Sequence, residues 1–590
     1  MSEFNLLDEG WISVVTDYKG TTKLVGMKEF FRDAHNYKAF AGDTKTQDFA
    51  VMRFLLAVLH TVFSRYDANG NPYEMLELNK RMQQVEEVYE EDESDYKDDL
   101  MKTWKDLWNC GKFPEIVDVY LEAWRDRFYL FDDKYPFYQV TKDFFNDCEL
   151  YSNKGAAKDA GSISFKTINR KISETGDNTA IFSMVGGNDS ELKDKLDNNQ
   201  LTRWLINYMA YSATPDKTKI KRYLDINDIE KYDGHKGWQN SIGAIHYKTD
   251  SLFMTFLLNL ILVHPDDKFI GKVQTPAWEL TPEENIRFYL DNNSINNLAR
   301  LYTDYSRAVY ISNERNQFGR FFNIAQLPIL DKKNNLLECM TIWEKTKKKD
   351  DNEEKWYPME NNPYESLWRN FGIIYLNNTV ESKDFRSPYI IDWFRKISKE
   401  ISDERYIKLS SVGINSATAS NLMKNDIDDE IYVNLEISYD LAKNGWLRRI
   451  NNLVEDTKKF LNEEYMKYTT DVVALDTGLL RSNATKNQKK LIDAKINSLI
   501  GEVYFKIDKP FKDWLSSIDY KEDKEKKLYE CKKMIVKIIK DESKRVALAH
   551  GDRAFVGIKF KLNNDVLYNN IAISFNKLAL KLTNYEKGDL

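Results

Sequence analysis

The sequence predicts an α+β protein, with a large mixed α/β N-terminal domain over residues 1–422 and a C-terminal four-helix bundle over residues 423–590. Three observations predict this fold class. A chain of 590 residues is too long for one hydrophobic core, so two or three domains are expected. The first part of the chain mixes short extended segments, loops and helical stretches. From Ile431 onward glycine is sparse and apolar residues keep helical spacing.

Composition limits the class of protein further. Hydrophobic residues make up 42% of the chain and aromatic residues 13%, which excludes a disordered composition. The formal net charge is −7, so any nucleic-acid binding must use local basic patches. The four cysteines lie far apart with no C-x-x-C pair, which argues against a zinc ribbon or a disulfide framework and fits a reducing cytoplasm. The first residues show no basic segment before an apolar one, so we expect no secretory signal.

Two apolar stretches of the N-terminal part predict buried helices. Thr46–Arg65 carries apolar residues at helical spacing over a wide stripe. Its most apolar run includes Arg53 and His60, and Ser251–Val263 is short and includes Asn259. Both stretches therefore fit buried core helices better than membrane spans.

Other segments of the N-terminal part have extended character. The sequence predicts a strand pair at Gly237–Lys248 and single strands at Thr303–Ile311, Asn370–Thr379 and Tyr406–Val412.

The C-terminal part shows four amphipathic patterns in succession. They cover Trp446–Leu461, Gln488–Tyr504, Lys524–Leu548 and Leu567–Leu582. Four helices of these lengths, each with one apolar stripe, predict an antiparallel bundle.

A basic segment lies at Thr214–Tyr223. Lys217, Lys219 and Lys221 alternate there, so an extended chain places three ammonium groups on one face. Such a row suits phosphates about as well as it suits water, and a solvated edge is the common outcome.

A polar turn follows the predicted strand at Thr303–Ile311. Arg315, Gln317 and Arg320 lie at its tip. Arginine and glutamine side chains can recognise the groove edges of a duplex, and they are equally ordinary at the tip of a loop.

The stretch Ser410–Asn421 consists mostly of small side chains and has no charge. One interpretation is an interdomain linker that ends in a helix cap, with Asn415 or Ser416 capping a helix from Ala417. The other is a wedge of small residues that slides against a nucleic-acid groove.

No recognised catalytic pattern occurs in the sequence. There is no G-x-x-x-x-G-K-[ST], G-x-G-x-x-G, H-E-x-x-H or G-x-S-x-G, and the six histidines are scattered. We therefore expect no cofactor, no metal site and no enzymatic activity, and a binding or assembly role is favoured.

Several landmarks together resemble one family. They are Phe4-Asn-Leu-Leu-Asp-Glu-Gly-Trp-Ile, Ala41-Gly-Asp-Thr-Lys-Thr-Gln-Asp, Pro136-Phe-Tyr-Gln-Val, Leu257-Leu-Asn-Leu, Pro276-Ala-Trp-Glu, the stretch Ser410–Asn421 and the terminal bundle. In these features the chain resembles the CasA family, the large subunit of the type I-E CRISPR surveillance complex Cascade. The resemblance extends over almost the whole chain.

The resemblance implies a non-catalytic role. The family's subunit sits at the 5′ handle of the guide RNA and scans double-stranded DNA for the protospacer-adjacent motif (PAM). It recognises this motif from the minor-groove side, starts strand separation, and later helps to recruit the helicase–nuclease. Base pairing then recognises the long target and protein recognises only the short flank.

The resemblance also assigns roles to residues of this chain. Aligned on Gly413, Thr418 takes the position of the family's wedge glutamine and Ala419 that of the following alanine, with Asn415, Ser416 and Ala417 as neighbours that share the work. The loop Thr214–Lys219 corresponds to a glycine-rich loop of the family and places Lys217, Thr218 and Lys219 at phosphates. A family lysine that enters the minor groove corresponds to Arg320, with Arg315 as the alternative and Gln317 between them. The guide-RNA docking loop corresponds to Ile181, Phe182, Ser183 and Met184, with Phe182 as the aromatic anchor.

Three hypotheses follow for the function. The first is a DNA-scanning subunit of a guide-RNA complex, with the guide RNA, target duplex, other Cascade subunits and helicase–nuclease as partners, no membrane association and a cytoplasmic location. The second is a stand-alone nuclease or other hydrolase whose active site is assembled from distant carboxylates. The third is a purely structural scaffold.

Overall fold

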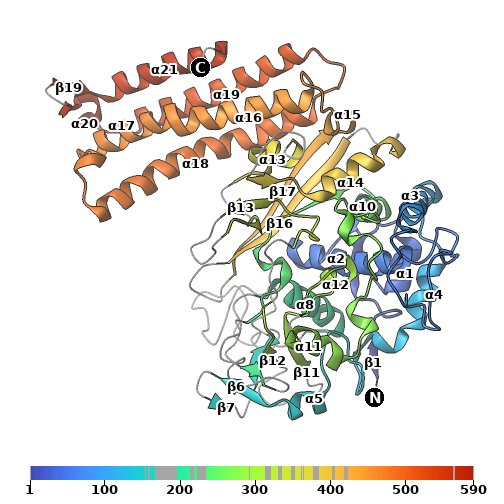
Figure 1. Ribbon diagram of the computed structural model, residues 1–590. Helices are drawn as coiled ribbons and strands as arrows, with labels where there is room; N and C mark the ends of the chain where they lie inside the picture. The colour runs from blue at the N-terminus through green and yellow to red at the C-terminus, as the bar shows by residue number, and fades with distance from the viewer. Residues whose placement is uncertain are drawn as a thin grey trace. The chain divides into compact units, whose positions relative to one another are not determined.

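The structure is a computed structural model and describes most of the chain. The described residues are 2–152, 155–156, 160–165, 196–212, 218–221, 234–291, 293–311, 321–329, 335–346, 353–360, 362, 365–376, 384–401, 406–416, 423–562 and 565–588. The chain forms two compact units, which we call the N-terminal unit and the helical unit (Figure 1). The first comprises Met1–Pro363, Lys383–Ser402 and Leu409–Asp429, and the second comprises Tyr364–Ser382, Asp403–Lys408 and Glu430–Leu590.

The N-terminal unit is built around helix α2, Lys45–Phe63, and the predicted buried helix at Thr46–Arg65 is thereby confirmed. Every residue of α2 from Phe49 onward is buried, and the helix packs against α4, α8, α10 and α12. By length and composition alone, α2 is the one helix in the described part that could cross a membrane, but its burial within the unit is that of a core helix.

Further helices surround α2. They are α1 (Met27–Asp33), α3 (Glu93–Cys110), α4 (Ile116–Ala123), α5 (Lys142–Asp147), α8 (Asn198–Tyr211), α10 (Leu252–Asn259), α11 (Pro282–Leu290), α12 (Leu298–Tyr302) and α14 (Tyr389–Ile397).

Small sheets complete the N-terminal unit. The order β1-β5 joins Glu3–Asn5 and Tyr129–Phe131, β3-β2-β4 joins Thr22–Val25, Ile12–Val15 and Ala39–Phe40, and β14-β13-β15 joins Lys355–Pro358, Trp343–Thr346 and Phe385–Arg386. A larger sheet has the order β11-β12-β9-β6-β7, with β8 also paired to β12. A three-stranded sheet has the order β10-β16-β17, and its first strand is β10, Ala244–Lys248.

The Ala41-Gly-Asp-Thr motif closes the start of α2. Thr44 is the N-cap residue, and its hydroxyl accepts a hydrogen bond from the backbone N–H of Gln47 at 3.2 Å. In return, the Gln47 side chain accepts from the backbone N–H of Asp43 at 2.9 Å, and the Asp48 carboxylate accepts from that of Gly42 at 2.8 Å. A Cβ at Gly42 would collide with the Asp48 carboxylate, so this position requires glycine. The motif is therefore a helix start rather than a site.

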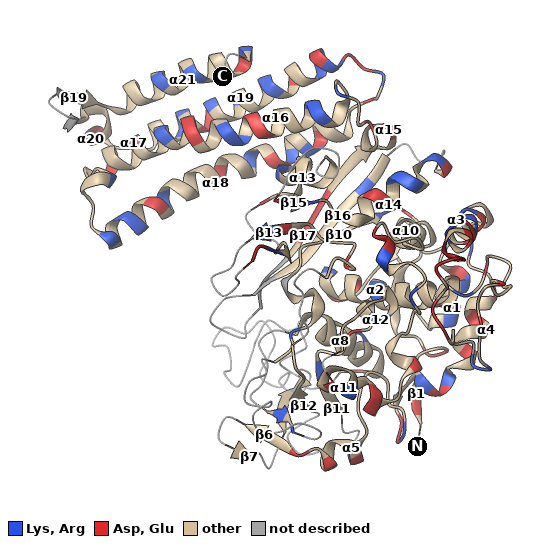
Figure 2. Ribbon diagram, in the orientation of Figure 1, with Lys and Arg blue, Asp and Glu red and all other residues tan. Residues whose placement is uncertain are grey.

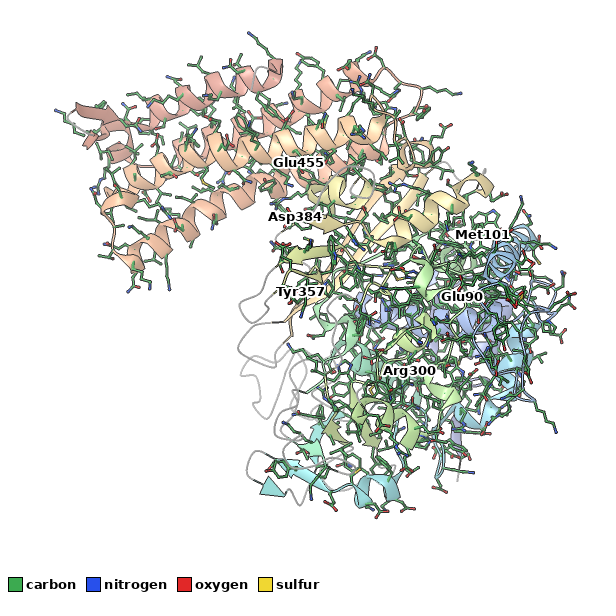
Figure 3. All side chains as sticks on the ribbon, in the orientation of Figure 1. Glu90, Met101, Arg300, Tyr357, Asp384 and Glu455 are labelled. Atoms are coloured by element: carbon green, nitrogen blue, oxygen red, sulfur yellow. The ribbon has the colours of Figure 1, made fainter. Side chains whose placement is uncertain are left out.

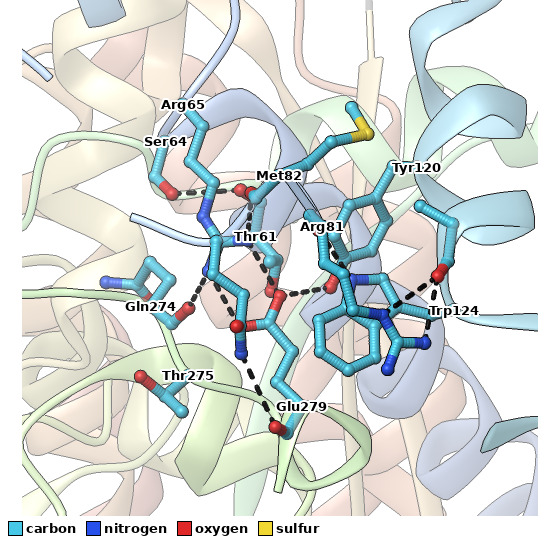
Figure 4. Close-up of polar contacts among 12 residues, drawn as sticks. Thr61, Ser64, Arg65, Arg81, Met82, Tyr120, Trp124, Gln274, Thr275 and Glu279 are labelled. Carbon is cyan, nitrogen blue, oxygen red and sulfur yellow. Dashed lines mark hydrogen bonds and ion pairs between the residues drawn. The ribbon is translucent and has the colours of Figure 1, made fainter. Parts of the chain in front are cut away.

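Buried ion pairs link distant segments in this unit. Arg65 donates to both carboxylate oxygens of Glu279, at 2.7 and 3.0 Å, and Tyr120 donates to the same carboxylate at 2.6 Å (Figure 4). Arg300, labelled in Figure 3, is also buried and lies 4.5 Å from the ring centre of Phe288. Such charges are tolerated inside a protein because partners satisfy them.

The helical unit contains the predicted bundle. Its helices are α16 (Trp446–Phe460), α17 (Met466–Thr477), α18 (Lys486–Ser516), α19 (Lys524–Leu548) and α21 (Ile571–Lys587). A π-helical turn, Leu461–Tyr465, joins α16 to α17, so these two form one bent bundle helix. Shorter elements of the unit are α13 (Phe371–Tyr375), α15 (Leu435–Ser438), α20 (Asp552–Val556), β18 (Ile558–Leu562) and β19 (Asp565–Asn569).

The bundle closes on itself. Helix α17 packs against α18, α18 against α19, α19 against α21, and α21 against α17 (Figure 1). Buried residues such as Ile507, Ile539 and Leu578 recur at helical spacing and fill the centre. Together with the mixed N-terminal unit, this arrangement confirms the predicted α+β fold class.

Two predicted elements are wrong. Gly237–Lys248 is not a strand pair, because residues 238–241 form a 3-10 turn and β10 pairs with the distant β16. Asn370–Thr379 is not a strand, because α13 places Phe371, Ile374 and Tyr375 on one buried helical face. In both segments, side-chain burial in the folded protein overrides a local preference for extended structure.

The chain passes between the two units along β16 (Tyr406–Ser416) and β17 (Met423–Asn434). Two earlier segments, Tyr364–Ser382 and Asp403–Lys408, also belong to the helical unit. The sequence-based division between residues 422 and 423 stays a prediction.

Candidate nucleic-acid interface

The larger sheet of the N-terminal unit carries three of the predicted segments. Strand β11, Arg307–Ile311, runs antiparallel to β12, Phe321–Gln326, with Ile311 opposite Phe322. Strand β8, Gly161–Ser164, lies on the other side of β12, with Ser164 opposite Phe321. The predicted strand at Thr303–Ile311 is thus confirmed, and residues 312–320 connect the two strands of a hairpin.

Two predicted contact segments leave this sheet at the same end. The connection 312–320 carries Arg315, Gln317 and Arg320, and the segment that follows β8 carries the docking loop Ile181–Met184. All of these residues lie outside the described part. The strand ends that hold them are adjacent, because Ile311 and Ser164 pair with neighbouring residues of β12, and paired strands lie about 4.8 Å apart.

Aromatic packing fixes this end of the sheet. The ring of Phe322 lies 5.3 Å from that of Phe165, which directly follows β8, and 5.9 Å from that of Tyr208 on α8. Helix α8 begins with a capping box in which Asp197 and Gln200 bond each other's backbone. The chain therefore leaves the sheet after Phe165 and returns at Asp197, and both points are held by packing or capping.

The basic segment belongs to the other end of β12. Strand β9, Lys219–Ile220, runs parallel to β12 with Lys219 opposite Gln326. Gln326 is five residues after Phe321, which corresponds to roughly 17 Å along a strand. Thr218 is buried, and its carbonyl accepts from the backbone N–H of Gln326 at 2.8 Å.

The predicted row of three lysines is not a free row in the structure. Lys221 donates to Glu149 at 2.6 Å, and Lys219 is half-buried within the sheet. Lys217 lies outside the described residues. The strand pairing of residues 219–220, with β6 (Leu150–Ser152) on one side and β12 on the other, explains the difference.

The wedge stretch lies between two strands. Asn415 and Ser416 are the last residues of β16, so neither caps a helix at Ala417, and the predicted cap is wrong. Ser410, Ser411 and neighbouring residues of β16 are buried, so this part is not a linker. Ala417, Thr418 and Ala419 lie outside the described residues, in a connection of six residues. A connection this short suits antiparallel neighbours, since parallel strands need a longer crossover.

A buried ion pair supports the sheet of the wedge strands. Arg53 of α2 donates to both oxygens of Glu338, at 3.0 and 2.7 Å, and Trp238 donates to Glu338 at 2.7 Å. Ala244 of β10 bridges to Thr341, three residues after Glu338. Since β10 pairs with β16, the ion pair anchors the edge of this sheet.

Sequence reasoning missed this pair, although a signal for it exists. Arg53 interrupts the apolar run of α2, and Glu338 stands in Leu336-Leu337-Glu338-Cys339-Met340. A charge inside an apolar run predicts a buried partner of opposite sign, because an unpaired buried charge is too costly.

The buried titratable groups are arranged for structure rather than for chemistry on a substrate. His235 lies 2.9 Å from Asp304, and Tyr289 donates to the same carboxylate at 2.7 Å. These side chains are buried, and no nucleophile lies beside the histidine among their printed partners. Within the described ranges, no group of three or more His, Cys, Asp or Glu side chains could hold a metal ion.

The fold and these segments define a class: a large two-unit protein with a mixed α/β unit and a helical bundle, whose candidate interface is made of strand connections. The sequence profile of the family described as CRISPR-associated protein Cse1 (CRISPR_cse1) matches residues 5–541. The chain belongs to this family.

Individual relatives agree with this assignment. The CRISPR-associated protein CasA/Cse1 of Thermus thermophilus is 29% identical over 141 residues, 24% of this chain and about a fifth (21%) of that relative's length. The crystal structure of Thermobifida fusca Cse1 has a TM-score of 0.70 and 21% identity, and the match covers 99% of this chain and 98% of the other. A chain of a CRISPR RNA-guided surveillance complex has a TM-score of 0.65 and 13% identity, over 99% of this chain and all of the other. At these identities, the two structures show a shared fold.

Proposed function

We propose that this chain is the non-catalytic large subunit of a type I-E, RNA-guided CRISPR surveillance complex. It recognises the PAM in target double-stranded DNA from the minor-groove side, starts duplex opening and helps to recruit the helicase–nuclease. Its further partners are the 5′ handle of the guide RNA and the other Cascade subunits, and its location is the cytoplasm. The observation that carries the proposal is the match of the Cse1 family over residues 5–541.

The geometry of the larger sheet supports the division into a DNA side and a guide-RNA side. The segment with Arg315, Gln317 and Arg320 and the segment with Phe182 start from adjacent strand ends. One end of one sheet can therefore present a flank-recognising turn and a guide-docking loop together. This is what a subunit needs if it checks the flank next to the guide-paired target.

The wedge is assigned to the connection between β16 and β17. A connection between two paired strands is a stiff platform, because both of its ends are fixed by a sheet. Small side chains at Ala417, Thr418 and Ala419 allow close approach to a duplex, and minor-groove proteins commonly separate base steps with inserted side chains.

The role is proposed as non-catalytic because the buried acids and bases of the described part satisfy one another. Arg53, Arg65 and His235 each pair with a buried carboxylate. These groups stabilise the N-terminal unit and are not exposed to a substrate.

The test is binding of the reconstituted guide-RNA complex to target duplexes with randomised flanks, with and without this chain. We expect strong flank preference only when the chain is present. Assembly without any flank preference would favour the scaffold hypothesis, and metal-dependent DNA cleavage by the purified chain would favour the hydrolase hypothesis. Either result would overturn the proposed function.

A further inference from the structure

Helix α19 of the bundle carries a continuous row of basic side chains on its outer face. The row, called here the α19 lysine row, consists of Lys533, Lys537, Lys540 and Lys544. At about 100° per residue, these four positions lie within an arc of roughly 60°. The buried positions of the helix, among them Ile535, Ile539 and Val546, lie on the opposite side. All four lysines are exposed, and Figure 2 marks the basic residues of this helix in blue.

The α19 lysine row has no ion-pair partner among the described residues. The acids close to it on the same helix are Glu530 and Asp541, and neither forms an ion pair with a lysine of the row. Other charges of α19 are already paired: Glu542 accepts from Lys506 and Arg545, and Glu525 pairs with Arg449. The bundle therefore neutralises its other charges locally and leaves these four ammonium groups open.

Such a row is unfavourable in the isolated chain. Lysines three and four residues apart on a helix repel each other, at about 0.2–0.5 kcal/mol per pair. In a protein with a net charge of −7, a straight row of four unpaired lysines is a local exception. A bound polyanion would remove the repulsion and gain from the same charges.

The dimensions of the α19 lysine row fit a phosphate backbone. From Lys533 to Lys544 the helix rises by about 16 Å, since each residue adds about 1.5 Å. A DNA duplex carries one negative charge per about 1.7 Å of its axis, so about ten phosphates pass a surface of that length. Lysine is a compact point charge on a flexible stem and contacts phosphates without base specificity.

We propose that the α19 lysine row is a second, sequence-independent DNA contact, which holds the phosphate backbone of DNA bound by the complex. This inference rests on the proposed function, because it needs DNA to be brought to the subunit. The row strengthens binding to any flank equally, whereas the segments of the N-terminal unit discriminate between flanks.

The test uses a quadruple variant, Lys533→Gln, Lys537→Gln, Lys540→Gln and Lys544→Gln, in the reconstituted guide-RNA complex. Glutamine keeps the helix propensity and removes the charge. The matched control changes four exposed lysines on separate segments to glutamine: Lys459, Lys521, Lys577 and Lys587. Both variants must keep the circular dichroism and thermal melting of the unchanged chain.

DNA affinity is measured at several salt concentrations, on duplex and on single-stranded targets. We expect the slope of log affinity against log salt to flatten by about 3 in the row variant, since each lost phosphate contact removes about 0.9 on duplex and about 0.7 on single strands. The arm with the larger change identifies the form of DNA that is held. Flank preference should be unchanged, and the control should keep the original slope.

Three outcomes overturn the inference: equal slopes in all three proteins, the same flattening in the control, or a loss of co-purification with other subunits at an unchanged slope. The last outcome would make the α19 lysine row a protein-binding surface. Failure of the proposed function looks different, because flank preference would then be absent already with the unchanged chain, whether or not the salt slope responds to the row.

Discussion

Arg53 and Glu338 form a doubly bonded ion pair across 285 residues of sequence, with neither side chain exposed. Burial alone would raise the pKa of Glu338, but the charge and hydrogen bonds of Arg53 outweigh it and hold this pKa below its ordinary value. The carboxylate therefore stays ionised at neutral pH. It also accepts from Trp238 and from the backbone N–H of Met340, so one ion pair organises the segment that borders β10.

Breaking this pair from one side should be severe. We expect Arg53→Met to destabilise the N-terminal unit by about 3–5 kcal/mol, because it leaves a buried carboxylate without its countercharge. The measurement is urea unfolding followed by tryptophan fluorescence.

The control for this prediction is the double variant Arg53→Met with Glu338→Leu. It removes both charges, so it should be less destabilised than Arg53→Met alone, apart from about 1–3 kcal/mol for the unpartnered Trp238 N–H. A double variant as unstable as the sum of the single variants would contradict a mutual pairing.

His60 should make the protein less stable in mild acid. Burial lowers the pKa of His60 from 6.5 to about 3, so the folded protein keeps this imidazole neutral while the unfolded chain takes up a proton. A lowered histidine pKa means that stability is lost as the pH falls below about 6.5.

The test compares unfolding of the unchanged chain and of His60→Leu at pH 7 and pH 5. Between these values, His60 alone should cost the unchanged chain about 2 kcal/mol that the variant does not lose. The comparison cancels other titrating groups, such as Asp48, whose pKa burial raises to about 6. An identical change in stability for the two proteins would refute the assignment.

The Thr44 cap should contribute to the stability of α2. We expect Thr44→Ala to cost about 1 kcal/mol, because the Gln47 N–H loses its acceptor. Thr44→Ser keeps the hydroxyl oxygen and serves as the matched control. Equal thermal melting of the two variants would show that the motif has another purpose.

The sequence could predict those parts of the fold in which one residue pattern decides the structure. Apolar spacing predicted α2 and the helices of the bundle, because each packs one face, or all of its faces, against the core. Gly237–Lys248 was predicted wrongly because β10 finds its partner more than 150 residues later, at β16. Non-local pairing of this kind leaves no local signal.

The candidate site could be predicted only in part, for a related reason. The types of residue at Lys217–Lys219 and Asn415–Ser416 suggested contacts, but strand pairing decides which of them are free. Lys221 found Glu149, Thr218 was buried, and β16 continued through Ser416. The common end of β8 and the β11–β12 hairpin depends on register, and a single sequence does not contain register across distant strands.

The wedge assignment makes a direct prediction. We expect Thr418→Glu with Ala419→Glu to reduce target binding by the assembled complex by more than tenfold, because two carboxylates would face the phosphate-rich groove at close range. The matched control is Asn293→Glu with Ser294→Glu, which adds the same charge at exposed positions between α11 and α12. Thermal melting should change in neither protein, and full target binding by the Thr418 and Ala419 variant would remove the wedge from this connection.

The docking loop makes a prediction that links assembly to flank recognition. Phe182→Ala should weaken association of the chain with the guide-RNA complex at least tenfold, since an aromatic anchor in an interface typically contributes 2 kcal/mol or more. The control is Phe505→Ala, which removes an aromatic ring that is 78% exposed on α18. Because the segments of Phe182 and Arg320 start from adjacent strand ends, loss of docking should also lower flank preference at limiting protein concentration, and excess protein should restore it. If association weakens but flank preference does not depend on protein concentration, the two segments act independently and the shared sheet end has no functional meaning.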